Sequence, residues 1–183
     1  MVSMLPVLET PRLVLSPLAL RHLDRFLTVA GARSIADTTI SLPHPLTEAA
    51  AREWIERAAA ESAAGLGAHF AVALRSEPGS LSGYAGIKSI DREHNQAELS
   101  FWLKDSLAGQ GYTTEAARAV VDHAFHHFEL NRLCAYHMVR NPASGRILAK
   151  LGFRQEGCLR QRVRKWGVYE DVLLWARLRD DPA

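Results

Sequence analysis

Hydrophobic residues recur with two different periods in the middle of the chain. From Ala97 to Leu103 they occupy every second position, with the polar Glu98 and Ser100 between them, as they do in a half-buried strand. From residue 113 to residue 128 they return every three or four positions, which predicts an amphipathic helix. Gly109 and Gly111 lie between the two segments, and glycine adopts positive φ angles without steric cost. The pattern predicts a strand, a glycine-bearing loop and a helix in direct succession.

A helix that begins right after such a loop directs several backbone N–H groups, together with its dipole, at one point. That point suits an anion such as a pyrophosphate. Thr113 or Thr114 is the expected cap of the helix. No lysine follows Gly111, which argues against a P-loop, and Thr114 stands where a dinucleotide-binding turn has its third glycine. An ordinary strand-to-helix connection is the alternative at this point.

The same two periods predict the remaining elements. Further strands are expected at residues 10–18, 69–74, 84–90, 132–139, 159–165 and 169–176. Further helices are expected at residues 19–29, 47–65 and 142–152, the second of them capped by Thr47. The segment 31–45 has no clear period and ends in two X-Pro pairs, which predicts a loop. This order predicts an α+β fold in three layers, with a mixed, mostly antiparallel central sheet of about seven strands and helices on both faces.

Composition narrows the class of protein. With 183 residues, of which 48% are hydrophobic and 23% charged, the chain fits one soluble domain. Its net charge of +2 is too small to demand a nucleic-acid partner. No apolar run is long enough to cross a membrane, and the first residues lack the basic start and apolar stretch of a signal peptide. We therefore expect a cytoplasmic protein.

Three further groups of residues invite a chemical interpretation. His123 and His127 have the spacing of metal ligands on one helix, but no HExxH glutamate and no third ligand accompany them, so we expect no metal. A stripe of alternating arginines is expected along one face of a late strand, as a solvated face or as an attraction for acidic substrate or RNA: Arg160, Arg162 and Arg164. The four tryptophans are expected in the core or against a cofactor: Trp54, Trp102, Trp166 and Trp175.

Five stretches resemble one family, in that family's order: TPRLVLSPL, AELSFWL, AGQGYTTEA, NPASGRILAKLGF and LRQRVRKWGVYEDVLLWARL. The chain is similar to GNAT-superfamily N-acetyltransferases, and in particular to the RimJ/RimL-like branch, which includes acetyltransferases of ribosomal-protein N-termini. The resemblance covers residues 9–178 and implies a single domain there with the GNAT-type acyl-CoA N-acyltransferase fold. It also implies acetyl-CoA as donor and a primary amine as acceptor, and it is compatible with a homodimer.

The resemblance also assigns residues to the cofactor. The pantetheine arm would lie alongside a strand segment that splays from its neighbour, made of Phe101, Trp102 and Leu103. The pyrophosphate would meet the backbone amides of Gly109, Gln110, Gly111, Tyr112, Thr113 and Thr114. Asn141, in the family's Asn-x-x-Ser segment, would bind the cofactor arm, and Ser144 would lie near its sulfur.

The catalytic residues are less clearly assigned, because the chain departs from the family. Glu98, which resembles the family's AEL glutamate, is the candidate general base, and a polar residue on a solvated strand face is its alternative. Leu148 stands where many members have a tyrosine acid, which leaves Ser144 as the substitute; a serine that bonds local backbone is its alternative. Val163 replaces a glutamate of some members. In the pyrophosphate loop, the family's first and last motif positions hold Ala108 and Thr113.

The expected reaction is direct attack of the amine in a ternary complex, because neither cysteine has a recognisable activating histidine. An N-terminal α-amine of a protein is the favoured acceptor by resemblance, and an antibiotic, a polyamine or an amino acid is the alternative. The acceptor is expected between residues 36–46 and the final hairpin. A non-catalytic CoA-binding or sensing module and an RNA- or ribosome-binding protein are the competing classes.

Overall fold

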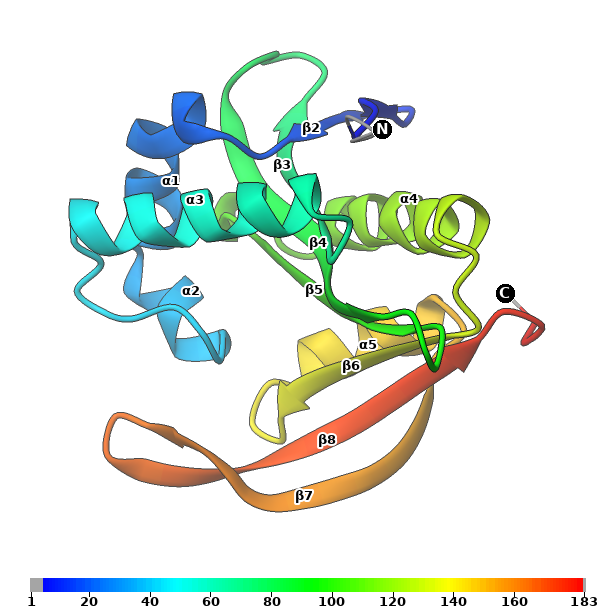
Figure 1. Ribbon diagram of the computed structural model, residues 1–183. Coiled ribbons are helices and arrows are strands. Elements are labelled where there is room, and N and C mark those ends of the chain that lie inside the picture. Colours follow the sequence, from blue (N-terminus) through cyan, green and yellow to red (C-terminus); the bar gives the residue numbers. More distant parts are fainter. Residues whose placement is uncertain (1–4, 183) are drawn as a thin grey trace.

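The computed structural model describes residues 5–182. The protein is built around a mixed sheet that is covered by helices on both faces (Figure 1). The described residues form eight strands in the order β1-β2-β3-β4-β5-β6-β8-β7. Their bounds are β1 Leu8–Glu9, β2 Leu13–Pro17, β3 Ala68–Leu74, β4 Leu81–Asp91, β5 Gln96–Leu103, β6 Arg132–Met138, β7 Arg154–Lys165 and β8 Val168–Leu178. The helices are α1 Leu23–Ala30, α2 Arg33–Thr38, α3 Glu48–Ala63, α4 Tyr112–His127 and α5 Pro142–Lys150.

Neighbouring strands pair antiparallel throughout, except for β5 and β6, which run parallel. The α+β fold with a mixed, mostly antiparallel sheet is therefore confirmed. The eighth strand is β1, where two residues pair with β2 ahead of the first expected strand. A two-residue strand shows no alternation of its own, so the sequence pattern could not reveal it.

The segment 31–45, expected as a loop, contains the short helix α2 and is corrected here. Its six residues make less than two turns, which is too short for a helical period to be visible. Ile35 and Ala36 are buried, so packing stabilises this helix. α2 lies at the end of the molecule that also holds the tip of the β7–β8 hairpin (Figure 1).

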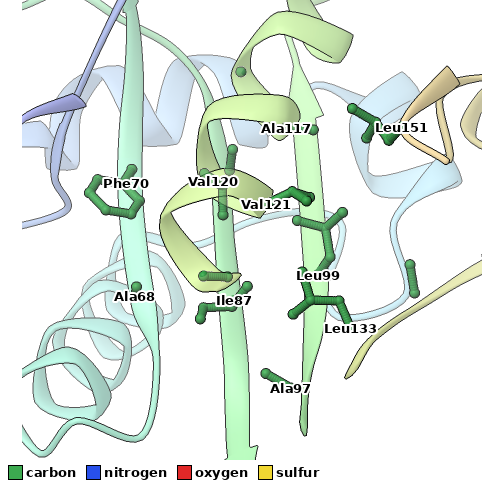
Figure 2. Packing of buried hydrophobic residues seen from close by; sticks show 14 of the residues in the cluster. Ala68, Phe70, Ile87, Ala97, Leu99, Ala117, Val120, Val121, Leu133 and Leu151 are labelled. Carbon is green, nitrogen blue, oxygen red and sulfur yellow. The ribbon is translucent and has the colours of Figure 1, made fainter. Parts of the chain in front are cut away.

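Two hydrophobic cores separate the sheet from its helices. The first lies under α4 and α5, where Val120 and Val121 pack onto Phe70, Ile87 and Leu99 of three adjacent strands (Figure 2). The second lies under α1 and α3 on the opposite face and is rich in aromatic residues, including Phe26, Tyr84 and Trp102. Alternation along each strand supplies both cores, since successive side chains point to opposite faces.

A chain of three polar groups runs from the second core towards the surface, from the buried Tyr84 and His69 to Glu61, whose side chain is 34% exposed. The Tyr84 hydroxyl lies 2.8 Å from Nδ1 of His69, and Nε2 of His69 lies 2.9 Å from a carboxylate oxygen of Glu61. Burial lowers the pKa of His69, although the hydrogen bond with Glu61 opposes that shift. A Cβ at Gly86 would lie 2.6 Å from the Tyr84 hydroxyl, and one at Gly67 would lie 2.7 Å from His69 Nε2. These two glycines leave the room that the polar chain occupies.

Candidate active site

The central feature is a notch between β5 and β6. The described pairs between them are Gln96–Arg132, Ala97–Leu133 and Glu98–Cys134. Beyond Glu98, β5 stays paired with β4 as far as Leu103, and β6 stays paired with β8 as far as Met138. The two strands diverge, as Figure 1 shows, so the edge of β5 that faces the notch carries backbone groups without a strand partner.

A narrow cavity of about 60 Å³ lies in this notch and is lined from both faces of the sheet. From the face that carries α4 and α5 it is lined by Leu99, Phe101, Ala135, His137, Ser144 and Leu148. From the other face it is lined by Lys88, Glu98, Ser100, Trp102, Tyr136, Trp54 and the segment Thr38–Ser41. The structure thus brings together Glu98 and Ser144, the two candidate catalytic residues, although they lie on different elements and approach from opposite sides.

Glu98 lies on β5 at the last paired position before the notch. One of its carboxylate oxygens is 2.9 Å from the ammonium nitrogen of Lys88, its neighbour on β4. About a quarter of its side chain is exposed, so the carboxylate is neither buried nor fully solvated. This placement gives Glu98 access to the cavity while an ion pair holds its side chain in position.

Asn141 and Ser144 form the start of α5. The side-chain oxygen Oδ1 of Asn141 accepts a hydrogen bond from the Ser144 backbone N–H at 3.4 Å, and the side-chain Nδ2 of Asn141 donates to the Ser144 hydroxyl oxygen at 3.0 Å. Asn141 is therefore the N-cap of the helix, followed by Pro142 in the first turn. Because the Ser144 oxygen accepts from Asn141, its own hydrogen is free to donate into the cavity.

The loop between β5 and α4 has the geometry of an anion cradle. Gly109 has φ +74° and Gly111 has φ +80°, and no atom lies within 4 Å of a Cβ built at Gly109. Gly111 is the N-cap of α4 and makes no side-chain cap hydrogen bond, so the expected cap at Thr113 or Thr114 is wrong. The positive φ of Gly111 lets the chain enter the helix at Tyr112, which places both threonines inside the first turn.

This loop is held from β2 and its preceding turn. The Arg12 guanidinium donates to the Gln110 carbonyl at 3.0 Å and lies over the Tyr112 ring, 4.1 Å from its centre. It also forms an ion pair with Glu115 in the first turn of α4, at 2.6 Å. Burial alone would raise the pKa of Glu115, but hydrogen bonds from Thr10 and Arg12 outweigh it and lower that pKa. The amides of the loop are thus fixed in position before any ligand arrives.

A set of contacts, here called the latch, holds the segment 37–42 against the β7–β8 hairpin and the turn before α5. Lys165 is buried and donates from Nζ to the carbonyls of Thr39 and Leu42, both at 2.9 Å. Asp37 at the end of α2 accepts from the Trp166 indole and from Arg140. Burial lowers the pKa of Lys165. The latch joins the segment 37–42, part of which lines the cavity, to the hairpin and to the turn before α5.

Tyr136 is one of the cavity residues that the sequence analysis missed. Alternation along 132–139 places it on the same face as Cys134, but nothing local shows that this face opens into the notch. Burial raises the pKa of Tyr136, and the neighbouring Cys134 adds to the shift. Burial, together with the Glu98 charge, raises the pKa of Cys134, so this thiol is less ionised than a free cysteine.

The β7–β8 hairpin bears on two expectations about other side chains. A β-bulge between Leu159 and Val163, with Gln161 at φ +49°, interrupts the regular pairing of the strand that carries Arg160, Arg162 and Arg164. Trp166 is 43% exposed at the hairpin turn and belongs to neither core, so the expected core position is wrong for this tryptophan.

The histidine pair on α4 has a packing environment. The rings of His123 and His127 stack with their centres 4.7 Å apart, and His123 packs edge-on against Phe70 and Phe128. Burial, together with His127, lowers the pKa of His123 to about 4. Among residues 5–182 there is no group of three histidine, cysteine or acidic side chains that could hold a metal ion. The same part of the chain contains no helix long and apolar enough to cross a membrane.

Comparison with known families agrees with this geometry. The Acetyltransferase (GNAT) domain family matches residues 12–154, and the chain belongs to that family. A ribosomal-protein-serine acetyltransferase of Escherichia coli is 35% identical over 100 residues, which are 55% of this chain and 56% of that protein. Two Bacillus subtilis relatives are 36% and 30% identical, and the chain spans 62% and 55% of their lengths. The chain therefore spans only a little over half of these relatives.

Solved structures support the fold. RimL, a ribosomal L7/L12 α-N-protein acetyltransferase in complex with coenzyme A, superposes with a TM-score of 0.85 at 19% identity, covering 94% of this chain and 98% of that one. A spermidine N-acetyltransferase from Vibrio cholerae in complex with CoA and spermine superposes with a TM-score of 0.82 at 20% identity, covering 94% of this chain and 98% of that one. The expected GNAT fold and the resemblance to the RimJ/RimL-like branch are confirmed.

Proposed function

We propose that this protein transfers an acetyl group from acetyl-CoA to a primary amine, and that the acceptor is the N-terminal α-amine of a protein. The notch carries the proposal. In a chain of the GNAT family, it brings the free edge of β5, the Glu98 carboxylate and Ser144 to one narrow cavity, and the chain continues from that edge into the glycine loop at the N-terminus of α4.

The residues present fit acetyl-CoA. The free edge of β5 at Phe101, Trp102 and Leu103 offers backbone groups to the amide-rich pantetheine arm. The amides of residues 109–114 surround the N-terminus of α4, whose dipole favours a pyrophosphate. Asn141 lies beside Ser144 on the far wall. When bound, acetyl-CoA supplies an activated thioester.

Glu98 accepts the proton of the amine, directly or through water. The reaction forms a C–N bond, breaks the C–S bond and releases one proton from the ammonium. An α-amine with a pKa near 8 is about one-tenth neutral at pH 7, whereas a lysine is neutral at only about 0.04%. Deprotonation of the acceptor by a general base is therefore less necessary for an N-terminal α-amine than for a lysine side chain. A positioned carboxylate contributes roughly 10²–10⁴-fold.

Ser144 and Tyr136 supply the remaining hydrogen bonds. Ser144 donates to the departing sulfur from the α5 side, in place of the tyrosine that Leu148 replaces. Tyr136, with its raised pKa, stays protonated at neutral pH and orients the acceptor amine from the other side. The raised pKa of Cys134 disfavours an acetyl-cysteine intermediate, which supports direct attack. A backbone N–H near Trp102 or Leu103 polarises the thioester carbonyl.

A small-molecule amine is the second candidate acceptor. The cavity of about 60 Å³ admits an amine end and little more, and this property suits a polyamine as well as a peptide. A non-catalytic CoA-binding module would share the cofactor side and lack turnover.

Two experiments test the proposal. Acetyl-CoA at about 100 times its Kd should raise the Tm measured by thermal unfolding by roughly 5–10 °C. At this ligand excess, binding stabilises the folded protein by roughly 2.7 kcal/mol. Mass spectrometry of short peptides with free N-termini, incubated with enzyme and acetyl-CoA, should show acetylation at the α-amine. Binding without transfer to peptides or polyamines would support the non-catalytic module instead.

A further inference from the structure

An exposed apolar and basic patch covers the tip of the β7–β8 hairpin. It consists of Trp166, Val168 and Tyr169, which are 43%, 61% and 60% exposed, flanked by Arg33 and Arg164; we call these five residues the hairpin surface. The Arg33 guanidinium lies 5.6 Å from the centre of the Trp166 ring, and that of Arg164 lies 5.7 Å from the centre of the Tyr169 ring. Stacked arginine–aromatic pairs of this kind are typical of interaction surfaces.

Three arginines of this region make no ion pair in the described part of the chain. Within residues 5–182, no carboxylate lies within ion-pair distance of Arg33, Arg162 or Arg164. Of the nearby acids, Asp37 and Glu170 both bind Arg140, and Asp171 accepts a hydrogen bond from the backbone N–H of Gln161. An anionic partner would therefore find unpaired guanidinium groups here.

The hairpin surface continues into the mouth of the cavity. Trp166 donates to Asp37, and the residues that follow Asp37 line the cavity. Among them Ile40 is 42% exposed, so the apolar surface reaches the opening. Arg162 lies close enough to the cavity residue Tyr136 to oppose the rise of its pKa. A chain that enters the cavity with its first residue can thus cross this surface with the residues that follow.

Protection of a sheet edge is the simpler explanation for the arginines. β7 is an edge strand, and charged side chains and bulges are common defences against edge-to-edge association. That explanation does not account for three neighbouring exposed apolar residues at the same tip, which increase the risk of association. A docking role accounts for both features.

We propose that the hairpin surface binds an acidic polypeptide segment that follows the acceptor's N-terminus. This inference rests on the proposed function, because it assumes that the acceptor is a protein. Carboxylates would pair with Arg33, Arg162 and Arg164, and apolar side chains would pack on Tyr169 and Val168. A nucleic acid fits less well, since the whole chain carries only +2 and the carboxylates of Asp37, Glu170 and Asp171 lie among the arginines.

The test measures binding directly, without relying on turnover. Two fluorescent 20-residue peptides share the first four residues, and one continues with aspartate and glutamate while the other has asparagine and glutamine. Anisotropy at low salt is measured with the wild-type protein and with the R33Q/R164Q double variant. R154Q is a control for the loss of one exposed arginine elsewhere on the same strand, because Arg154 lies at the opposite end of β7, where it pairs with Asp181. We expect the acidic peptide to bind about tenfold more tightly than the neutral one, and the double variant to abolish that difference.

Each other outcome has a defined meaning. Equal binding of the two peptides, or a preference that survives in R33Q/R164Q, overturns the proposal. So does tighter binding of a single-stranded RNA of the same length. A Y169A variant should weaken both peptides equally, since its contribution is apolar. If the acidic peptide binds but is never acetylated, the docking surface stands and the proposed acceptor class fails.

Discussion

The two sides of the notch are built in opposite ways. On the side proposed for the cofactor, the groups offered to a ligand are mostly backbone amides from one continuous segment, residues 98–115, held by Arg12 and Glu115. On the acceptor side, the wall is made of side chains that meet across long sequence separations. Arg140 reaches Asp37 over 103 residues, and Lys165 reaches Thr39 over 126.

This difference predicts that the cofactor side tolerates sequence change, whereas the acceptor side changes with its side chains. Backbone donors persist through most side-chain replacements, so the cofactor side suits a ligand that does not change. The acceptor wall changes with each substitution in α2 or the hairpin. The two superposable structures, one named for a ribosomal protein and the other for spermidine, are consistent with one frame serving different acceptors.

The strongest test separates chemistry from cofactor binding at Glu98. Glu98→Gln keeps the shape but removes the base, so we expect kcat to fall by roughly 10²–10⁴ while the acetyl-CoA thermal shift is unchanged. Glu93→Gln, in the exposed β4–β5 turn, is the control. An unchanged kcat in Glu98→Gln would remove Glu98 from the mechanism.

Gly111→Val should weaken acetyl-CoA binding without changing the acceptor side. A β-branched residue at φ +80° costs about 1–2 kcal/mol and adds bulk to the anion cradle, so we expect Kd for acetyl-CoA to rise at least about tenfold. Gly79→Val provides a matched strain control, since Gly79 has φ +83° in the β3–β4 turn and no atom within 4 Å of a built Cβ. Equal loss of cofactor affinity in both variants, measured by calorimetry, would show that strain alone is responsible.

Lys165→Met opens the acceptor side. The carbonyls of Thr39 and Leu42 lose their donor, which should lower the free energy of unfolding by about 1–3 kcal/mol. Because segment 37–42 is then less constrained, KM for the acceptor should rise while Kd for acetyl-CoA stays constant. Arg154→Met serves as control. A rise in both constants would contradict the independence of the two sides.

His123→Leu should produce the smallest change, confined to acid. Burial holds the pKa of His123 near 4 in the folded protein, against about 6.5 unfolded. Between these values the unfolded chain binds more protons, so stability falls as pH drops from 6.5 towards 4. After allowance for partial exposure, the loss is about 1–2 kcal/mol by pH 4.

The leucine variant lacks this dependence and should lose less stability between pH 7.5 and pH 4.5 than wild type, as measured by urea unfolding. His94→Gln, in an exposed turn, should behave like wild type. A parallel decline in all three proteins would exclude His123 as the cause.

Local features of the fold were predictable, and features made by distant contacts were not. The Thr47 cap is confirmed, with its hydroxyl accepting from the Ala50 N–H at 3.2 Å, because both residues lie in one turn. The glycine-bearing loop between strand and helix was likewise predictable, because Gly109 and Gly111 lie within it. The burial of Lys165 and the opening of Tyr136 into the cavity depend on where α2 and β5 lie, and no nearby residue encodes either. The bulge at Gln161 likewise depends on the pairing partner β8.

The divergence of β5 from β6 has a further consequence for hydrogen exchange. The amides of β5 that face the notch are inside the sheet, yet they have no carbonyl of a neighbouring strand to slow their exchange with solvent. A pantetheine arm laid along this edge would take the place of the absent strand. The cofactor would then complete the hydrogen bonding of the sheet. Slower hydrogen exchange at a few central β5 amides would report cofactor binding before any acceptor is present.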